Sequence, residues 1–170
     1  MRGYFAIGIE NTKDAFNVGS LWRTADLFGA AFIFTIGRRY KTQASDTMKT
    51  SRRVPLFHYA DLADFLGHLP YDAQLVGLEL DPQAKPVEHF CHPERAVYLL
   101  GAEDHGLSKA ALQRCQHLVQ LPGRASLNVA VAGSITLYDR HVKTCSEGKP
   151  KRFKVTGESV PQYYAKEIEE

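Results

Sequence analysis

The sequence predicts an α/β protein whose mainly parallel β-sheet is covered by helices on both faces. Two observations indicate this fold. Short apolar runs alternate along the chain with segments in which apolar residues recur at helical spacing. The runs are nearly continuous in apolar residues, which is typical of parallel strands that are buried on both faces. A chain of 170 residues is long enough to bury such a core.

The first elements are predicted to be a strand, a helix and a second strand. Residues 4–9 form an apolar run, and apolar side chains recur at helical spacing over residues 17–28, with Asn17 as the expected N-cap. Gly29 is expected to end that helix, because glycine readily adopts the left-handed conformation of a C-terminal cap. The β-branched and aromatic run 31–36 predicts the second strand.

The remaining elements follow the same alternation. Polar and basic residues predict a loop over 37–53, and repeated prolines predict another over 81–94. Strands are expected at 54–59, 74–80, 96–100 and 117–121, and helices at 62–69, 108–115 and 128–142. We predict a single domain over residues 1–145 and a C-terminal tail over residues 146–170.

Charge and cysteine content narrow the class of protein. The formal net charge is +2, yet residues 1–53 carry roughly five more positive than negative charges, which favours an anionic partner. A second basic run covers residues 140–154. The three cysteines are odd in number and far apart, which indicates a reducing, cytoplasmic setting. No apolar run reaches the length of a membrane span, so we expect a soluble protein without a membrane partner.

Three stretches lie where a strand's carboxyl end is predicted to meet a helix, which is where ligands bind in open parallel sheets. In the first, 17-NVGSLWRTADLFG-29, Ser20 and Arg23 interrupt the apolar pattern of the helix. A lone arginine at such a position is as often a surface residue as a functional one.

The second stretch is 99-LLGAEDHGLS-108. Gly101 and Gly106 allow a sharp turn or a close approach of the backbone to a ligand. Glu103 and Asp104 place carboxylates before the next helix, where they are ordinarily capping groups.

The third stretch is 119-VQLPGRASLNVAVAGSITLYDR-140. Ser126 and Asn128 offer a hydroxyl and an amide group at the start of the last long helix. The small residues that follow, Ala130, Ala132, Gly133 and Ser134, leave that helix almost bare, so we expect another backbone to pack closely there.

A metal site is not predicted. His89, Cys91 and His92 lie close together in the sequence, with Cys115 and His117 further on, but their spacing fits no familiar zinc pattern.

Taken together, the three stretches resemble the motifs of the SpoU (TrmH) family of SPOUT RNA ribose methyltransferases. The residues that carry the resemblance are 17-NVGSLWRTA-25, 101-GAEDHG-106, and 121-LP-122 with 126-SLNV-129, and the similarity spans roughly residues 4–142. The resemblance implies a deep C-terminal trefoil knot and bound S-adenosylmethionine, held mainly by backbone groups. It also implies a homodimer whose active site uses residues of both chains, and Ala130, Gly133 and Ser134 are then expected to pack against a helix across the dimer interface.

The resemblance also assigns residues to the site. For catalysis it points to Arg23, supported by Asn17, Glu103, Ser126 and Asn128. The cofactor contacts that it implies are Leu78, Gly101, Leu121 and Leu127, with Glu103, Gly106 and Ala130 beside them. A guanidinium is a poor base near neutral pH, so we expect Arg23 to clamp a phosphate and stabilise the developing 2′-alkoxide.

The RNA is expected to be held by this domain itself, because the chain begins almost directly on its first strand. The candidate RNA-binding residues are Arg38, Arg39, Lys41, Arg52 and Arg53, with the 140–154 run as a second candidate. Tyr40 is expected to stack on an exposed base.

Transfer RNA is the expected substrate, with ribosomal RNA as the alternative. Three other functions are weighed against ribose methylation: methylation of a base, noncatalytic RNA binding, and nucleotide binding by an ordinary α/β domain. The missing GxGxxG after the first strand disfavours the last.

Overall fold

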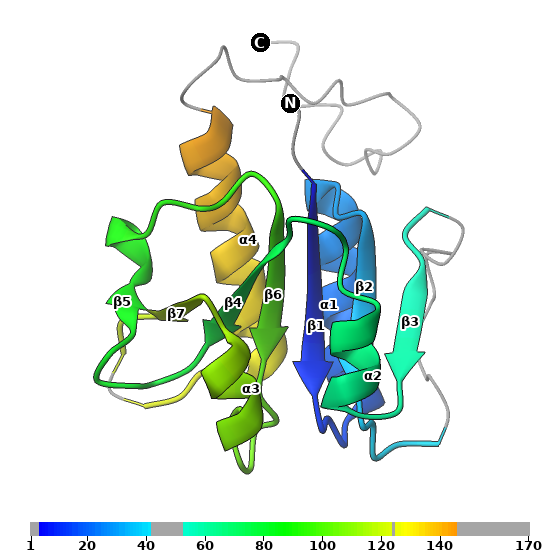
Figure 1. Ribbon diagram of the computed structural model, residues 1–170. Coiled ribbons are helices and arrows are strands. Elements are labelled where there is room, and N and C mark those ends of the chain that lie inside the picture. Colours follow the sequence, from blue (N-terminus) through cyan, green and yellow to red (C-terminus); the bar gives the residue numbers. More distant parts are fainter. Residues whose placement is uncertain (1–3, 42–52, 124, 146–170) are drawn as a thin grey trace, which may run out of the picture.

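The computed structural model describes residues 4–41, 53–123 and 125–145, which contain a single parallel β-sheet (Figure 1). Its seven strands lie in the order β3-β2-β1-β6-β4-β7-β5, and every neighbouring pair is parallel. The strands are β1 (Phe5–Glu10), β2 (Phe32–Ile36), β3 (Leu56–Tyr59), β4 (Gln74–Leu78), β5 (Lys85–Pro86), β6 (Ala96–Leu100) and β7 (His117–Gln120). The predicted parallel sheet is therefore confirmed.

Helices cover both faces of this sheet. The α-helices are α1 (Ala15–Phe28), α2 (Leu62–Gly67), α3 (Lys109–Arg114) and α4 (Val129–Cys145), and a short 3₁₀-helix, η2, spans Val87–His89. Leu21 of α1 and Leu137 of α4 belong to one buried cluster, whereas Phe65 of α2 and Ala111 of α3 belong to a second cluster on the opposite face. The two central strands, β1 and β6, are buried along their whole length because they contact both clusters.

Helix α1 begins earlier than the sequence predicted. Asp14 is its N-cap: the Asp14 carboxylate accepts a hydrogen bond of 2.8 Å from the Phe16 N–H. The prediction that Asn17 caps this helix is therefore wrong, and the Asn17 side chain is used for a tertiary contact instead. Gly29, with a φ of 77°, ends the helix as expected.

The segment predicted as a loop over 81–94 contains β5 and η2. Strand β5 lies at the end of the sheet and pairs with β7, so Pro86 is tolerated at a position without a second neighbouring strand. The expected tail over residues 146–170 lies outside the described residues. The trefoil knot is not tested by the strand order and stays a prediction. No helix in the described part of the chain has the length and hydrophobicity that a bilayer crossing requires.

The bare face of α4 packs inside the chain. Gly133 is buried, and a Cβ added to it would lie 2.5 Å from Leu21 Cδ1 and 3.3 Å from Ile7 Cδ1. Ser134 Oγ lies 2.9 Å from Thr24 Oγ1 of α1. The expectation that Gly133 faces another chain is therefore wrong. Gly133 and Ser134 instead allow α1 of the same chain to approach α4 closely.

A buried polar network holds the second half of α4 against the sheet. His92 bridges the Tyr98 hydroxyl at 2.6 Å and Asp139 Oδ2 at 2.7 Å, and burial lowers the pKa of this imidazole. Arg140 is only 3% exposed and donates to the carbonyl oxygens of Pro93 and Glu94. Arg140 is therefore a structural residue and not part of an exposed basic surface.

Replacing Gly133 with leucine is predicted to lower the free energy of unfolding by about 3 kcal/mol, because overpacking a filled interface forces its neighbours to move. Urea denaturation checks this value. Gly67→Leu is the matched control, since a Cβ at Gly67 meets no atom within 4 Å. Equal stability of the two variants would contradict the close α1–α4 packing.

Candidate active site

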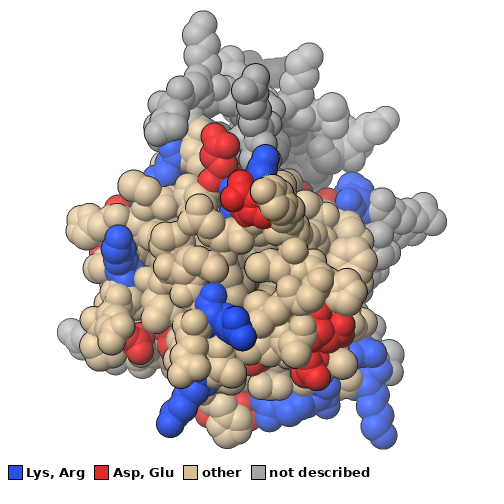
Figure 2. All heavy atoms as spheres, in the orientation of Figure 1, with Lys and Arg blue, Asp and Glu red and all other residues tan. Residues whose placement is uncertain are grey.

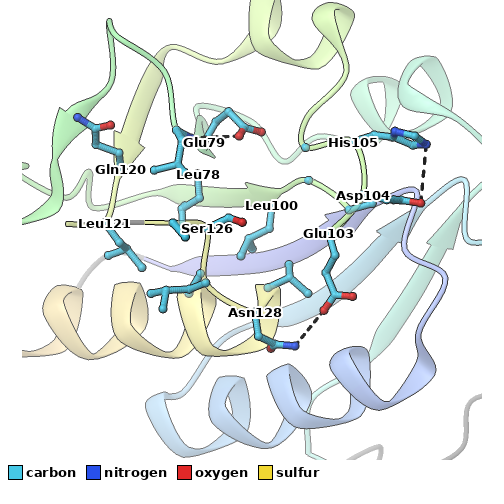
Figure 3. Close-up of a pocket in the computed structure, with 18 of the residues that line it drawn as sticks. Leu78, Glu79, Leu100, Glu103, Asp104, His105, Gln120, Leu121, Ser126 and Asn128 are labelled. Atoms are coloured by element: carbon cyan, nitrogen blue, oxygen red, sulfur yellow. Dashed lines mark hydrogen bonds and ion pairs between the residues drawn. The ribbon is translucent and has the colours of Figure 1, made fainter. Parts of the chain in front are cut away.

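A cavity of about 500 Å³ lies at the carboxyl ends of β4, β6 and β7 (Figure 3). Its walls are formed by the segments that follow these strands and by the start of α4. The predicted residues that line it are Leu78, Gly101, Glu103, Gly106, Leu121, Ser126, Leu127 and Asn128. The structure therefore brings together residues of the second and third stretches, as expected at this edge of a parallel sheet.

Three predicted site residues lie outside this lining. Ala130 lies in a separate groove between α1 and α4, and Ala132 lines the cavity instead. Asn17 reaches the cavity through its hydrogen bonds with Glu103 and Asn128, which line it. Arg23 is half-buried on α1 and lines neither hollow.

The turn after β6 needs glycine at both of its ends. Ala102 and Gly106 form an isolated antiparallel bridge, which folds the turn back on itself. A Cβ at Gly101 would lie 2.0 Å from the Gly106 carbonyl carbon, and Gly106 has a φ of 65°. The two motif glycines are thus explained by the path of the backbone around the cavity.

Two carboxylates that the sequence analysis missed fix the end of this turn. Glu79 accepts a hydrogen bond of 2.7 Å from the Leu107 N–H, and Glu10 accepts bonds of 2.8 Å from both the N–H and the hydroxyl of Ser108. Glu10 is only 3% exposed. Both glutamates lie at the carboxyl end of an apolar strand, and that position was the signal that could have identified them.

The three sequence stretches meet in one polar cluster beside the cavity. Asn17 Nδ2 donates to Glu103 Oε1 at 2.7 Å, and Asn128 Nδ2 donates to the same oxygen at 2.9 Å and to Asn17 Oδ1 at 3.0 Å. Asn128 Oδ1 in turn accepts from the Ala130 N–H at 2.9 Å, so Asn128 also caps α4. Ser126 lies exposed at the cavity wall (Figure 3).

Arg23 lies on a different face of α1, among exposed apolar side chains. Phe16 and Leu27, which flank it at a spacing of seven and four residues, are 64% and 66% exposed. A continuing apolar stripe on α4 consists of Val131, Ile135, Tyr138 and Val142. Ser20 and Thr24 of α1 line one groove with Val131 and Ile135 of α4, so this side of α1 adjoins the stripe.

Two of the predicted RNA-binding arginines are already held by carboxylates. Arg39 forms a bidentate pair with Asp104, at 2.7 and 3.0 Å, and Arg53 forms a bidentate pair with Asp26. The hydrogen bonds from Arg39 hold the pKa of Asp104 well below its usual range. On the face shown in Figure 2, Lys and Arg are dispersed and Asp and Glu lie between them.

The other candidate RNA contacts differ in accessibility. Arg38 and Lys41 are exposed, whereas Arg52 lies outside the described residues. The Tyr40 ring is half-buried against the core, and the Arg38 guanidinium lies 5.5 Å from its centroid. The stacking of Tyr40 on an exposed base stays a prediction, and only the exposed part of the ring is available for it.

Several of the histidines and cysteines considered as metal ligands make other contacts or are buried. His92 belongs to the buried network, His117 bonds to Gln74, and burial raises the pKa of the Cys115 thiol to about 12. Within residues 4–41, 53–123 and 125–145, no group of three or more His, Cys, Asp or Glu side chains is arranged to hold a metal ion.

Known proteins resemble this chain over most of its length. Residues 4–138 match the model of the SpoU rRNA methylase family. The 23S rRNA (guanosine-2′-O-)-methyltransferase of Acinetobacter baylyi is 27% identical over 142 residues, which cover 78% of this chain and 57% of that protein. The chain spans 36% to 63% of the length of several curated relatives that it matches.

Solved structures show the same fold. The TrmH/SpoU tRNA modifying enzyme of A. aeolicus aligns with a TM-score of 0.76 at 21% identity, covering 97% of this chain and 87% of that chain. The AdoMet-bound rRNA methyltransferase of Sinorhizobium meliloti aligns with a TM-score of 0.70 at 25% identity, covering 84% of this chain and 57% of that chain.

Replacing Asn17 with aspartate is predicted to destabilise the protein by about 2 kcal/mol at pH 7.5, because a second carboxylate would face Glu103 in place of an N–H donor. Repulsion between the two carboxylates raises the pKa at which one of them takes up a proton. The stability deficit should therefore shrink as the pH falls toward about 5.

Asn17→Ala is the matched control for this experiment. It removes the same hydrogen bonds without adding a charge, so its deficit should not depend on pH. Denaturant unfolding at several pH values measures both variants. A pH-independent deficit for Asn17→Asp would show that the Asn17–Glu103 contact does not form in solution.

Proposed function

The chain belongs to the SpoU rRNA methylase family, and we propose on that basis that it transfers the methyl group of S-adenosylmethionine to a ribose 2′-hydroxyl of RNA. The observation that carries the proposal is the junction of the cavity with the polar cluster. Asn128 lines the cavity and also binds Glu103 and Asn17, so a substrate hydroxyl at the cluster would lie beside a ligand in the cavity.

The cavity suits this cofactor in size and charge. Its volume of about 500 Å³ lies in the range of sites for molecules of this size. Leu78, Leu100 and Leu121 provide apolar walls. Acidic residues line it, and none of the described lining residues is Lys or Arg, which favours a cationic sulfonium. When bound, S-adenosylmethionine supplies an electrophilic methyl carbon on that sulfonium.

The protein's own residues then have two tasks, alignment and charge stabilisation. Ser126 and Asn128 are placed to orient a ribose hydroxyl at the cavity. Arg23 would clamp the adjoining phosphate bidentately and stabilise the developing alkoxide, while a phosphate oxygen or a water molecule takes the hydroxyl proton.

The proposal includes a homodimer that completes the site. Arg23 does not line the cavity of its own chain, and it lies next to Ser20 and Thr24 on α1, which line one groove with Val131 and Ile135 of the α4 stripe. A second copy of the chain that covers Val131, Ile135 and Tyr138 would bury this stripe. Its Arg23 would then approach the cavity from across the interface.

The RNA that we propose is a tRNA, and the reaction is placed in the cytoplasm. Arg38 and Lys41 are exposed close to the Arg39–Asp104 pair, whereas Arg39 and Arg53 are engaged by carboxylates. Arg38 and Lys41 would contact phosphates of the RNA. Cys91 and Cys115 are free thiols, in keeping with a reducing compartment.

The wild-type protein is predicted to transfer a labelled methyl group from S-adenosylmethionine to unmodified tRNA and to make one linkage resistant to alkaline hydrolysis. Arg23→Ala should lower kcat by about a hundredfold or more while leaving the dissociation constant of S-adenosylmethionine within about twofold. Arg114→Ala, on the exposed last turn of α3, is the matched control.

Other outcomes assign other functions. A methylated base without a resistant linkage would indicate a base methyltransferase, and methylation of rRNA alone would exclude tRNA. Binding of RNA without binding of S-adenosylmethionine would indicate a noncatalytic protein.

Ile135→Glu is predicted to convert the dimer to a monomer, because a charge would be buried at the centre of the apolar stripe. Analytical ultracentrifugation measures the change, and Tyr71→Glu, at a side chain that is 92% exposed, is the control. A monomeric wild-type protein would contradict the proposed interface.

Coexpression of Arg23→Ala and Asn128→Ala chains tests whether the site is shared. Each homodimer should be inactive, but a mixed dimer has one site with an intact Asn128 and the partner's intact Arg23. Random assembly should recover about a quarter of the wild-type activity. No recovery would place Arg23 and Asn128 in the site of the same chain.

A further inference from the structure

One ion pair links the segments that follow three adjacent strands. Arg39 follows β2, and its guanidinium binds Asp104 in the turn that follows β6, with Nη2–Oδ1 at 2.7 Å and Nη1–Oδ2 at 3.0 Å. The same arginine contacts the segment that follows β1, where its Nε donates to the Asn11 carbonyl oxygen at 2.6 Å. Strands β2, β1 and β6 are neighbours in the sheet, so the pair spans their common edge.

The backbone holds Arg39 in place independently of Asp104. The Arg39 N–H donates to the Thr12 carbonyl oxygen at 2.8 Å. Asn11 itself has a φ of 54°, and its N–H donates to the Ile36 carbonyl oxygen at 2.7 Å. Arg39 is therefore held by its backbone N–H and by its Nε independently of the carboxylate. This reduces the conformational entropy that the side chain loses when it pairs with Asp104.

Asp104 follows Glu103, the carboxylate that connects the three segments of the site. Glu103 accepts the hydrogen bonds from Asn17 and Asn128, and Glu103, Asp104 and His105 all line the cavity (Figure 3). The turn is fixed at its far end by Glu79 and Glu10. Between Glu103 and this far end, the turn is held by the bidentate ion pair of Asp104 with Arg39. Lys13, at 3.4 Å from Asp104, is a weaker second contact.

We propose that Arg39 is a positioning residue of the cofactor site: through Asp104 it holds the turn that carries Glu103, and this is its function in place of RNA binding. The inference rests on the proposed function, because the cavity wall is assigned to S-adenosylmethionine. Exposed ion pairs ordinarily contribute little, but a bidentate pair with a pre-positioned arginine is the exception.

Calorimetric titration with S-adenosylmethionine tests this inference. Arg39→Gln and Asp104→Asn should each raise the dissociation constant of S-adenosylmethionine by roughly fivefold to tenfold. The double variant should be no weaker than either single one, because both remove the same interaction. In methylation assays, KM for S-adenosylmethionine should rise while kcat at saturating cofactor stays close to the wild-type value.

Arg95→Gln is the matched control. Arg95 pairs with Asp72 at 2.9 Å on the surface, before β6 begins and thus at the opposite edge of the sheet from the cavity. This variant should bind S-adenosylmethionine as tightly as the wild type. Thermal unfolding of all variants separates a local effect on the turn from a loss of the fold.

Three results would overturn the inference. If Arg39 binds RNA, Arg39→Gln weakens RNA binding and reduces its salt dependence by about one phosphate contact, with unchanged cofactor affinity. Unchanged cofactor affinity in Asp104→Asn removes the inference but leaves the proposed function intact. A wild-type protein that does not bind S-adenosylmethionine overturns both.

Discussion

One carboxylate oxygen connects the three segments from which the site is built. Glu103 Oε1 accepts from Asn17, which is 86 residues away in the sequence, and from Asn128, which is 25 residues away. Asn17 and Asn128 are also bonded to each other across 111 residues. These contacts form only after α1, the turn after β6 and the start of α4 reach the same edge of the sheet. The correct geometry of the site therefore depends on the packing of α1 against α4.

That packing explains why the sequence behind Asn128 is so poor in large side chains. Gly133 allows Leu21 to lie against the backbone of α4, and Ser134 meets Thr24 at hydrogen-bonding distance. The small side chains correctly predict a close approach of another helix, but the prediction that this helix belongs to a second chain was wrong for Gly133. Small side chains indicate a close approach between helices, whereas the identity of the approaching helix depends on the order of strands in the sheet.

Features with a local cause were predictable from the sequence, and features with a distant cause were not. Continuous apolar runs predict the buried strands. Gly29 and Gly106 predict the helix end and the sharp turn, because glycine tolerates the positive φ values found at both positions. The prediction of Asn17 as a helix cap failed because Asp14 competes for the same function and Glu103 offers Asn17 a tertiary partner. Asp14 lies only three residues before Asn17 and could have been recognised as the cap, whereas the contact of Asn17 with Glu103 depends on the fold.

The same distinction applies to charged side chains. A basic run beside a predicted site suggested nucleic-acid contacts, but Arg39 and Arg53 each face a carboxylate from a distant part of the chain. Asp104 and Asp26 are 65 and 27 residues away from their respective arginines. Asp26 lies within residues 1–53 and is already part of their net charge, whereas Asp104 comes from outside, so the fold lowers the positive charge that this segment offers to a ligand.

The geometry of α1 fits the proposed site that two chains share. Arg23 follows Asn17 by six positions, which on a helix corresponds to a rotation of about 120° and a rise of about 9 Å. Asn17 is buried and faces Glu103, so Arg23 leaves the helix in a different direction from that cluster. In the proposed dimer one helix would therefore serve two sites. Asn17 would hold Glu103 beside the cavity of its own chain, and Arg23 would act at the cavity of a second copy.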